Sequence, residues 1–300
     1  MKVDENVSLK KKTTMRIGGL VRYYAELQTR EDVEEAVQFA QEKNLPLIVL
    51  GGGSNTIFAD GIIDALVVKV VAEKSAPLPN PLPRGEGKFY TVQAGKILAS
   101  LINELAEQNL DLSLLTGIPG TVGGAIFGNA GQGPHGTWID QFVESIEFFW
   151  QGKWQTFTKE ECEFGYRESG FKHWWGEGTV PPIIWSVTLM IPSRPKKEVK
   201  IEVERLIQKR IETQPHLKTA GSCFKAVGGV PAWKLIDAAG LRGTKIGDVQ
   251  IAEKHANFLL NIADATFEDA KKIVKKVQES VPEKLEVEMR CIERNGILAF

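Results

Sequence analysis

The segment Thr116-Gly117-Ile118-Pro119-Gly120-Thr121-Val122-Gly123-Gly124-Ala125 constrains the fold of this chain more than any other stretch. It holds four glycines and a proline within ten residues, with apolar side chains between them. Glycine costs backbone entropy on folding, so such a cluster requires either a tight turn or the close approach of a ligand to the main chain. The interleaved apolar residues indicate a segment held in a core, unlike a loose Gly/Ser linker.

A second glycine loop, Leu50-Gly51-Gly52-Gly53-Ser54-Asn55-Thr56, follows a short apolar run. It lies in a predicted β-α-β start, with strands over 21–27, 45–50 and 66–71 and a helix capped by Thr29. The loop is neither G-x-G-x-x-G nor a Walker sequence, and an ordinary turn explains it equally well when it is taken alone. Its hydroxyl, amide and N–H groups nevertheless suit a phosphate. Two such loops in one half of the chain indicate one long ligand with a phosphate-bearing part and a planar part.

Composition excludes several functional classes. The 300 residues carry 37 basic and 38 acidic side chains, so neither nucleic acid nor a membrane surface is an expected partner. The N-terminus does not resemble a signal peptide, and no run approaches the roughly eighteen apolar residues of a spanning helix. The three cysteines and four histidines are scattered, which fits a reducing compartment and predicts no metal site.

Hydrophobic spacing predicts the remaining elements. Helices are expected over 97–109, with Ile97, Leu101 and Leu105 facing inward, and over 198–213, with a stripe of Val199, Val203, Leu206 and Ile207. Further helices are expected over 233–239 and from Thr266, where Asp269 completes a capping box. Strands are expected over 89–94, 142–150, 154–158, 183–191, 258–262 and 285–292. Residues 75–87 hold four prolines and two glycines and are expected to form an extended surface loop.

Three polar positions are candidates for chemistry. Arg167, between an aromatic residue and small residues, offers a two-pronged donor for a carboxylate, although a solvated loop arginine is the commoner case. Ser222 follows a glycine but has no G-x-S-x-G elbow and no evident His/Asp partner, so it is either a turn serine or a proton donor to a basic carbon. Glu288 shares a strand face with Glu286 and Arg290, and composition alone predicts that this face is solvated.

Six segments in this order are more specific than any one of them: GGGSN, GIPGTVGGA with Asn129-Ala130-Gly131, FGYRES, AGSCFK, EKHANF and LEVE. Together they resemble the UDP-N-acetylenolpyruvoylglucosamine reductase family, flavoenzymes that make UDP-N-acetylmuramate for peptidoglycan. The resemblance runs from about Thr13 to Glu293. It is to the shorter type of the family, because the segment between Ile191 and Gly221 leaves little room for the substrate-covering insertion of the longer type.

The resemblance implies an α+β fold: a two-part FAD-binding domain of the p-cresol methylhydroxylase type, followed by a smaller α/β substrate-binding domain. The two FAD-binding parts would be residues 1–72 and 89–196, separated by a Pro-rich insertion over 73–88, and the substrate-binding domain would be 197–300. It also implies non-covalent FAD, NADPH as the reductant, a UDP-sugar substrate and a cytoplasmic enzyme of cell wall biogenesis, cell shape and cell division.

The resemblance assigns cofactor binding to both glycine loops. The FAD pyrophosphate would lie on the first loop, at Gly51, Gly52, Gly53, Ser54, Asn55 and Thr56. The flavin would lie along the second, at Gly117, Ile118, Pro119, Gly120, Thr121, Gly123, Gly124 and Ala125, where side chains would be in the way. Asn129 is assigned to the cofactor as well.

Catalytic roles also follow from the resemblance. Hydride would pass from the reduced flavin to the terminal carbon of the enolpyruvyl group, and Arg167 would stabilise the charge that develops. Glu288 would hydrogen-bond the same carboxylate, which predicts a raised pKa for Glu288. Ser222 would deliver the proton. Tyr166, Lys225 and His255 would contact the substrate.

The chain departs from the family pattern in two segments. Ala226 stands where the family usually has asparagine, which removes one amide contact to the substrate, and Gln132-Gly133-Pro134 replaces the usual Ala-Tyr-Gly. Two alternatives stay open at this point. One is another FAD-dependent oxidoreductase of the same fold, such as an oxidase of a small alcohol, and the other is a nucleotide-sugar-binding protein without catalysis.

Overall fold

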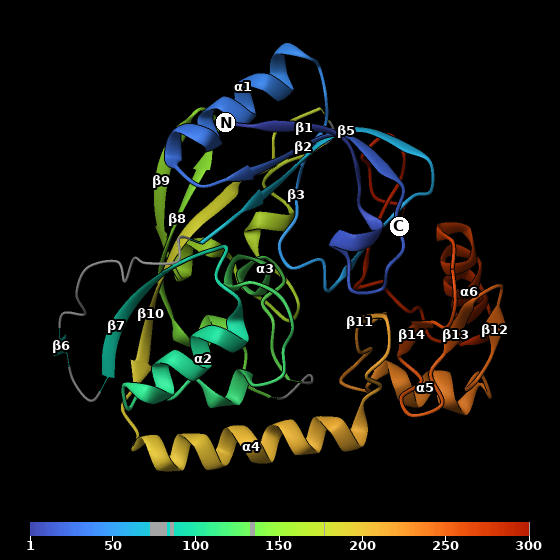
Figure 1. Ribbon diagram of the computed structural model, residues 1–300. Coiled ribbons are helices and arrows are strands. Elements are labelled where there is room, and N and C mark those ends of the chain that lie inside the picture. Colours follow the sequence, from blue (N-terminus) through green and yellow to red (C-terminus); the bar gives the residue numbers. More distant parts are fainter. Residues whose placement is uncertain (73–82, 85–86, 133–135, 177, 300) are drawn as a thin grey trace.

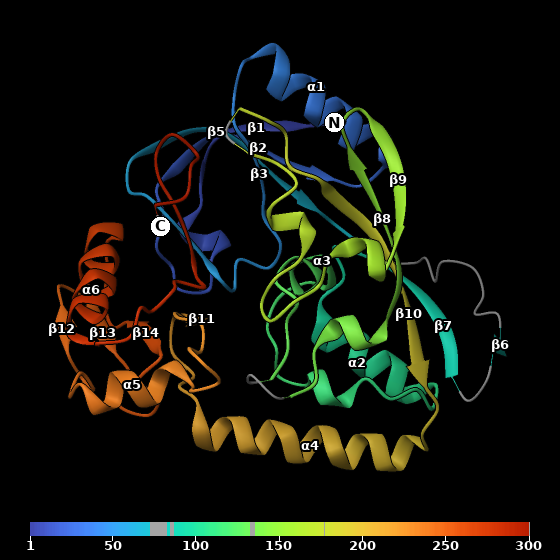
Figure 2. The ribbon, with the colours of Figure 1, turned by 180° about the vertical axis from the view of Figure 1, so that it is seen from behind.

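The structure is a computed structural model, and it describes residues 1–72, 83–84, 87–132, 136–176 and 178–299. Most of the predicted Pro-rich loop lies outside these residues. A larger part, coloured blue to yellow in Figure 1, stands beside a smaller part coloured orange to red. Helix α4 (Lys196–Thr213) runs beneath the larger part and leads into the smaller part, as the view from behind in Figure 2 also shows.

The first sheet of the larger part has the strand order β1-β2-β5-β3. These strands are β1 (Val3–Ser8), β2 (Leu20–Leu27), β5 (Ile62–Val70) and β3 (Leu47–Val49). Both β2 and β3 pair parallel with β5, and α1 (Arg30–Glu42) packs on the sheet, so the predicted β-α-β start is confirmed. Thr29 caps α1 in a capping box with Asp32, which fixes where the helix begins.

The second sheet is antiparallel and has the order β6-β7-β10-β8-β9. Its strands are β6 (Pro83–Arg84), β7 (Gly87–Gln93), β10 (Ile183–Pro192), β8 (Val143–Trp150) and β9 (Lys153–Thr158). Helices α2 (Leu98–Glu107) and α3 (Val122–Phe127) lie beside it. The inward position predicted for Ile97 is wrong, because α2 begins one residue later and leaves Ile97 45% exposed as its N-cap.

Helix α4 packs against the larger part. Val199 and Val203 join the same hydrophobic core as α2 and both large sheets. The predicted stripe is wrong at Ile207, which is 44% exposed and lines the large cavity. The predicted boundary at residue 197 stays a prediction, but the packing places this helix with the residues that precede it.

The smaller part has an antiparallel sheet of order β11-β14-β13-β12 with two helices. Its elements are β11 (Thr219–Ser222), α5 (Ala232–Ala238), β12 (Lys245–Ile246), β13 (Val249–Ile251), β14 (Phe258–Asn261) and α6 (Phe267–Ser280). The predicted capping box of Thr266 and Asp269 is confirmed at the start of α6. These elements form a second core, which also takes in Met15, Ile17 and Ile57 from the larger part.

The last strand returns to the larger part. β15 (Arg290–Ile292) pairs parallel with β4 (Thr56–Phe58), the strand that follows the first glycine loop. The predicted strand over 285–292 is too long, because Val287 makes only an isolated bridge to Phe224 before β15 begins. The consequence is that residues 288–290 run beside the first glycine loop, where Asn55 bonds to Glu288 O and Arg290 N.

Candidate active site

A cavity of about 1580 Å³ opens between the two parts. Both glycine loops, the last turns of α4, β11 and the side chains of Arg167 and Glu288 line it. A drug-sized ligand needs about 300–1,000 Å³, so this cavity has room for more than one ligand or for one long ligand.

The two glycine loops pack directly against each other. A Cβ atom on Gly52 would lie 2.6 Å from the Cα of Gly120, and one on Gly51 would lie 2.8 Å from Thr121 Oγ1. Ser54 Oγ donates to Pro119 O at 3.1 Å across the same contact. Side chains at these glycines would push the loops apart, so glycine is required to keep backbone N–H groups at the cavity wall. This cradle fits a dinucleotide cofactor with a phosphate-bearing part.

Every cofactor residue predicted from the sequence lines this cavity except Asn129. The Asn129 side chain is buried, its Nδ2 donates to Gly165 O at 2.8 Å, and its Oδ1 accepts from Asp140 N at 3.3 Å. The predicted cofactor contact of Asn129 stays a prediction, and in the structure its amide holds the turn that carries Arg167. Only the three-dimensional path of the chain brings residue 129 beside residue 165.

Arg167 sits in a tight turn between Gly165 and Glu168, whose backbones hydrogen-bond in both directions. Its φ is +59°, in the left-handed region. A residue other than glycine pays roughly 1–2 kcal/mol there. Contacts with the surrounding chain offset this cost, since Lys172 Nζ donates to the Arg167 carbonyl and Asn129 holds Gly165. The turn is therefore fixed by its surroundings, as a strained functional turn requires.

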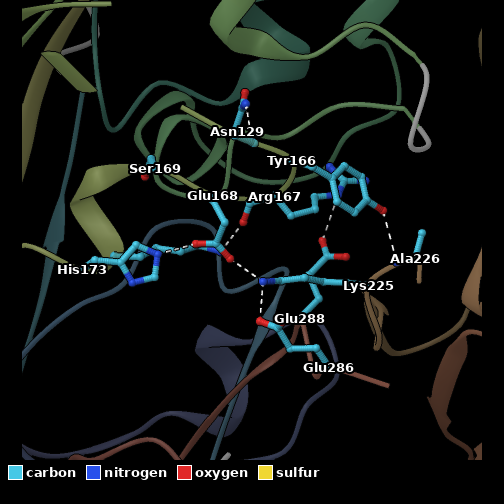
Figure 3. A network of polar contacts seen from close by, with 12 residues as sticks. Asn129, Tyr166, Arg167, Glu168, Ser169, His173, Lys225, Ala226, Glu286 and Glu288 are labelled. Atoms are coloured by element: carbon cyan, nitrogen blue, oxygen red, sulfur yellow. Dashed lines mark hydrogen bonds and ion pairs between the residues drawn. The ribbon is translucent and has the colours of Figure 1, made fainter. Parts of the chain in front are cut away.

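The Arg167 guanidinium faces the Glu288 carboxylate, with Nε 3.3 Å from Oε1 and each side chain only 15% exposed. Figure 3 shows the two side chains directed toward each other from the larger and smaller parts. Burial raises the pKa of Glu288, and the positive charges of Arg167, Lys172 and Lys225 oppose that shift. The predicted raised pKa is confirmed in direction. The cause of the shift in the structure is desolvation, whereas the prediction rested on a substrate carboxylate lying against Glu288.

Ser222 ends β11 and also lines the cavity. The preceding Gly221 has a φ of +77°, which only glycine adopts without strain. The next residue, Cys223, accepts a hydrogen bond from Glu288 N at 2.8 Å, so the serine lies one residue from the segment that carries Glu288. The three residues predicted to be catalytic are thus brought to one cavity by two different parts of the fold.

The predicted substrate residues divide into two groups. Tyr166 and His255 line the cavity, and Lys225 does not. The Tyr166 hydroxyl accepts from Ala226 N at 3.3 Å, so position 226 contributes its backbone to the site even without an amide side chain. Burial lowers the pKa of His255, whose ring lies against Trp233 and Phe258. Both side chains are therefore well placed to contact a ligand.

Three cations that were not predicted from the sequence also line the cavity, namely Lys172, Arg210 and Arg290. Arg290 Nη1 donates to Val49 O at 3.3 Å, and the guanidinium lies over the Phe127 ring. Burial lowers the pKa of Arg290 to about 10. Arg210 donates to Gly117 O at 2.7 Å from the last turns of α4. Arg290 could have been found, because it lies on the same alternating face as Glu288.

Two other features are absent from the described ranges. No group of three or more His, Cys, Asp or Glu side chains there is arranged to hold a metal ion. Within the same ranges, no helix has both the length and the apolar character needed to cross a membrane.

Comparison with known proteins connects this geometry to a family. A family model described as an FAD binding domain matches residues 21–152, and one described as the C-terminal domain of UDP-N-acetylenolpyruvoylglucosamine reductase matches residues 214–292. The UDP-N-acetylenolpyruvoylglucosamine reductase of Aquifex aeolicus is 35% identical, over 97% of this chain and 96% of the relative. The chain belongs to the UDP-N-acetylenolpyruvoylglucosamine reductase family.

Other members of this reductase family agree. The enzyme of Thermotoga petrophila is 35% identical over 92% of this chain and 93% of the relative. The crystal structure of the Thermus caldophilus reductase matches with a TM-score of 0.80 at 33% identity, covering 97% of this chain and 99% of that one. The predicted α+β class is confirmed, with an FAD-binding domain of the p-cresol methylhydroxylase type followed by a smaller domain. The prediction of an FAD-dependent oxidoreductase is also confirmed.

Proposed function

We propose that this chain catalyses the NADPH-dependent reduction of UDP-N-acetylglucosamine enolpyruvate to UDP-N-acetylmuramate through FAD, a step of peptidoglycan precursor synthesis. The observation that carries the proposal is the buried Arg167–Glu288 pair. It opens, with Ser222, into the cavity that both glycine loops line. The pair offers a cation and a proton-bearing carboxyl to a substrate carboxylate, which neither a small-alcohol oxidase nor a simple binding protein requires.

The glycine loops would hold FAD, the first at its pyrophosphate and the second along the flavin. When bound, FAD supplies hydride transfer, accepting hydride from NADPH and giving it to the substrate. The chain's own contribution is to orient both partners and exclude water. The sequence shows no Rossmann fingerprint for NADPH, so we place NADPH and the sugar nucleotide in the same cavity in turn.

Arg167 and Glu288 would bind the carboxylate of the enolpyruvyl group. The guanidinium stabilises the negative charge that grows on this carboxylate as hydride arrives at the neighbouring double bond. Because burial raises the pKa of Glu288, its carboxyl can carry a proton and donate a hydrogen bond where an ionised carboxylate would repel the substrate.

Ser222 would give its hydroxyl proton to the carbon next to the carboxylate. A hydroxyl is a weak acid, but the carbon that receives the proton is strongly basic at that point, so no His/Asp partner is needed. The left-handed Gly221 turns the chain so that the serine reaches the cavity wall. We also propose a cytoplasmic location, because NADPH and UDP-sugars are available there.

A visible spectrum of the purified protein under anaerobic conditions tests the proposal. We expect a yellow protein that bleaches when NADPH is added and recovers its colour when the enolpyruvyl sugar nucleotide follows. Bleaching without recovery would support the assignment as a flavoenzyme but reject this substrate. A colourless protein that cannot be reconstituted with FAD would reject the assignment of both glycine loops.

A further inference from the structure

Lys225 is a buried cation whose partners lie outside the cavity. Its side chain is 12% exposed, and its ammonium donates to the carboxylates of Glu168 and Glu286 (Figure 3). Burial alone would lower its pKa, but these two partners outweigh burial and raise it. The charge of Lys225 is thus committed to protein carboxylates, which leaves it unsuited to a substrate diphosphate.

The two partners stand next to the residues proposed to bind the substrate carboxylate. Glu168 follows Arg167 directly in the turn of the larger part, and Glu286 lies two residues before Glu288 in the smaller part. Lys225 belongs to the smaller part. The Lys225 backbone N–H donates to Glu286 O at 2.9 Å. The Asn257 side chain accepts a hydrogen bond from Phe224 N and donates one to Phe224 O, both at 2.9 Å.

Glu168 is itself held on the side of the larger part. His173 Nε2 lies 2.6 Å from its Oε2, and Lys172 Nζ lies 3.6 Å from its Oε1. Lys172 also donates to the Arg167 carbonyl. A shift of the Glu168 carboxylate therefore moves the turn that carries Arg167.

We propose that the Lys225–Glu168 pair is a latch between the two parts of the molecule that positions Arg167 against Glu288. Neither residue lines the cavity, so both are positioning residues that act through the turn at 165–168. The proposal rests on the function proposed above. Among the residues that the structure describes, the other polar contacts between the turn at 165–168 and the smaller part are the Arg167–Glu288 pair and the hydrogen bond from Ala226 N to the Tyr166 hydroxyl. The smaller part is also bonded to the first glycine loop, through Asn55 and Glu288, but that contact does not reach this turn.

The test compares Lys225→Met with Lys275→Met, both as FAD-loaded protein. Lys275 is a matched control, since it pairs with Glu279 on the exposed surface of α6 in the same part of the molecule. Stopped-flow absorbance should show that Lys225→Met slows reoxidation of reduced flavin by the sugar nucleotide about 10- to 100-fold, as misplacement by about 1 Å does. Reduction by NADPH should stay within about twofold. Lys275→Met should change neither rate, and Lys225→Arg should restore most of the loss.

A double-mutant cycle with Glu168→Gln tests the pairing. The latch predicts that Glu168→Gln and the double variant lose about as much as Lys225→Met alone. Additive losses would overturn it. A raised KM with unchanged kcat would also overturn it and return Lys225 to the substrate site, and equal slowing of both half-reactions would reduce the pair to general support of the fold.

Failure of the proposed function would be recognised separately. If the sugar nucleotide does not reoxidise the wild-type flavin, the substrate assignment fails whatever the variants do. The wild type, Lys225→Met, Glu168→Gln and the double variant are then compared in urea, where the latch predicts non-additive changes of the unfolding midpoint for residues 168 and 225. Additive changes there would overturn the latch as well.

Discussion

Glu288 carries the clearest pH signature of the site, since its folded-state pKa is raised by burial. A carboxyl of this kind stabilises the fold fully below the pKa of the unfolded chain, and that stability is lost as the pH rises through the folded pKa. Gln is an uncharged analogue of the protonated form. Glu288→Gln should therefore raise the Tm at pH 8, with a gain that shrinks as the pH falls toward the ordinary carboxyl range. Differential scanning fluorimetry across this range is the measurement, and a gain independent of pH would contradict it.

Ser222 is expected to act in only one half of the reaction. General acid catalysis contributes about 10²–10⁴-fold, so Ser222→Ala should slow flavin reoxidation by the sugar nucleotide by at least about 100-fold. Flavin reduction by NADPH should stay nearly intact, because no proton goes to the substrate carbon in that step. Rapid-mixing absorbance separates the two, and equal loss in both would remove the proton-donor role.

The sequence predicted which residues line the site better than it predicted their burial and their partners. The motif positions of Arg167, Ser222 and Glu288 all line the cavity. The burial of Glu288 could not be predicted, because alternation in the last strand placed it with the exposed Glu286 and its partner Arg167 comes from another part of the fold. The same reason explains why the hydrogen-bond partners of Lys225 and Asn129 could not be predicted.

Among the elements, the two glycine loops form the most demanding contact. Gly52→Ala would place a Cβ 2.6 Å from backbone atoms of Gly120, which cannot move aside as a flexible side chain would. We expect loss of bound FAD, measured by the ratio of visible flavin absorbance to ultraviolet protein absorbance.

Gly152→Ala provides the matched comparison. Gly152 has a φ of +75° in the turn between β8 and β9, and nothing lies within 4 Å of its added Cβ. This variant should lose about 1 kcal/mol of stability through backbone strain and keep its FAD. Equal flavin loss in both variants would mean that the packing of the two loops does not define the cofactor site.

Local sequence patterns predicted the helices and strands, but they could not predict which distant strands pair. The caps at Thr29 and Thr266 follow from residues three apart, so both helix starts could be read from the sequence. The pairing of β4 with β15 joins residues 56–58 to 290–292, and no local pattern specifies such a contact. For the same reason the last strand was predicted too long: it was expected over 285–292, whereas β15 covers only residues 290–292.

At the scale of the whole molecule, the cavity between the two parts links cofactor binding to stability. A ligand that binds only the folded state stabilises it by RT ln(1 + [L]/Kd), which is about 2.7 kcal/mol at 100 times Kd. Removing FAD should lower the Tm by several degrees, and adding FAD back should restore it. Scanning calorimetry of the stripped and reconstituted protein measures the shift, and an unchanged Tm would show that FAD does not bind the folded protein at this cavity.

The parallel pairing of β4 and β15 also bears on how the protein is made. The first glycine loop is synthesised long before residues 288–290, but Arg290 N donates to Asn55 O at 2.9 Å and Asn55 Nδ2 donates to Glu288 O at 3.2 Å. The loop thus receives these partners only after residue 290 has been translated. A nascent chain that ends before residue 288 lacks both contacts to its cofactor cradle, so we expect stable flavin loading only after this segment has been made, and a product truncated before it should hold FAD poorly.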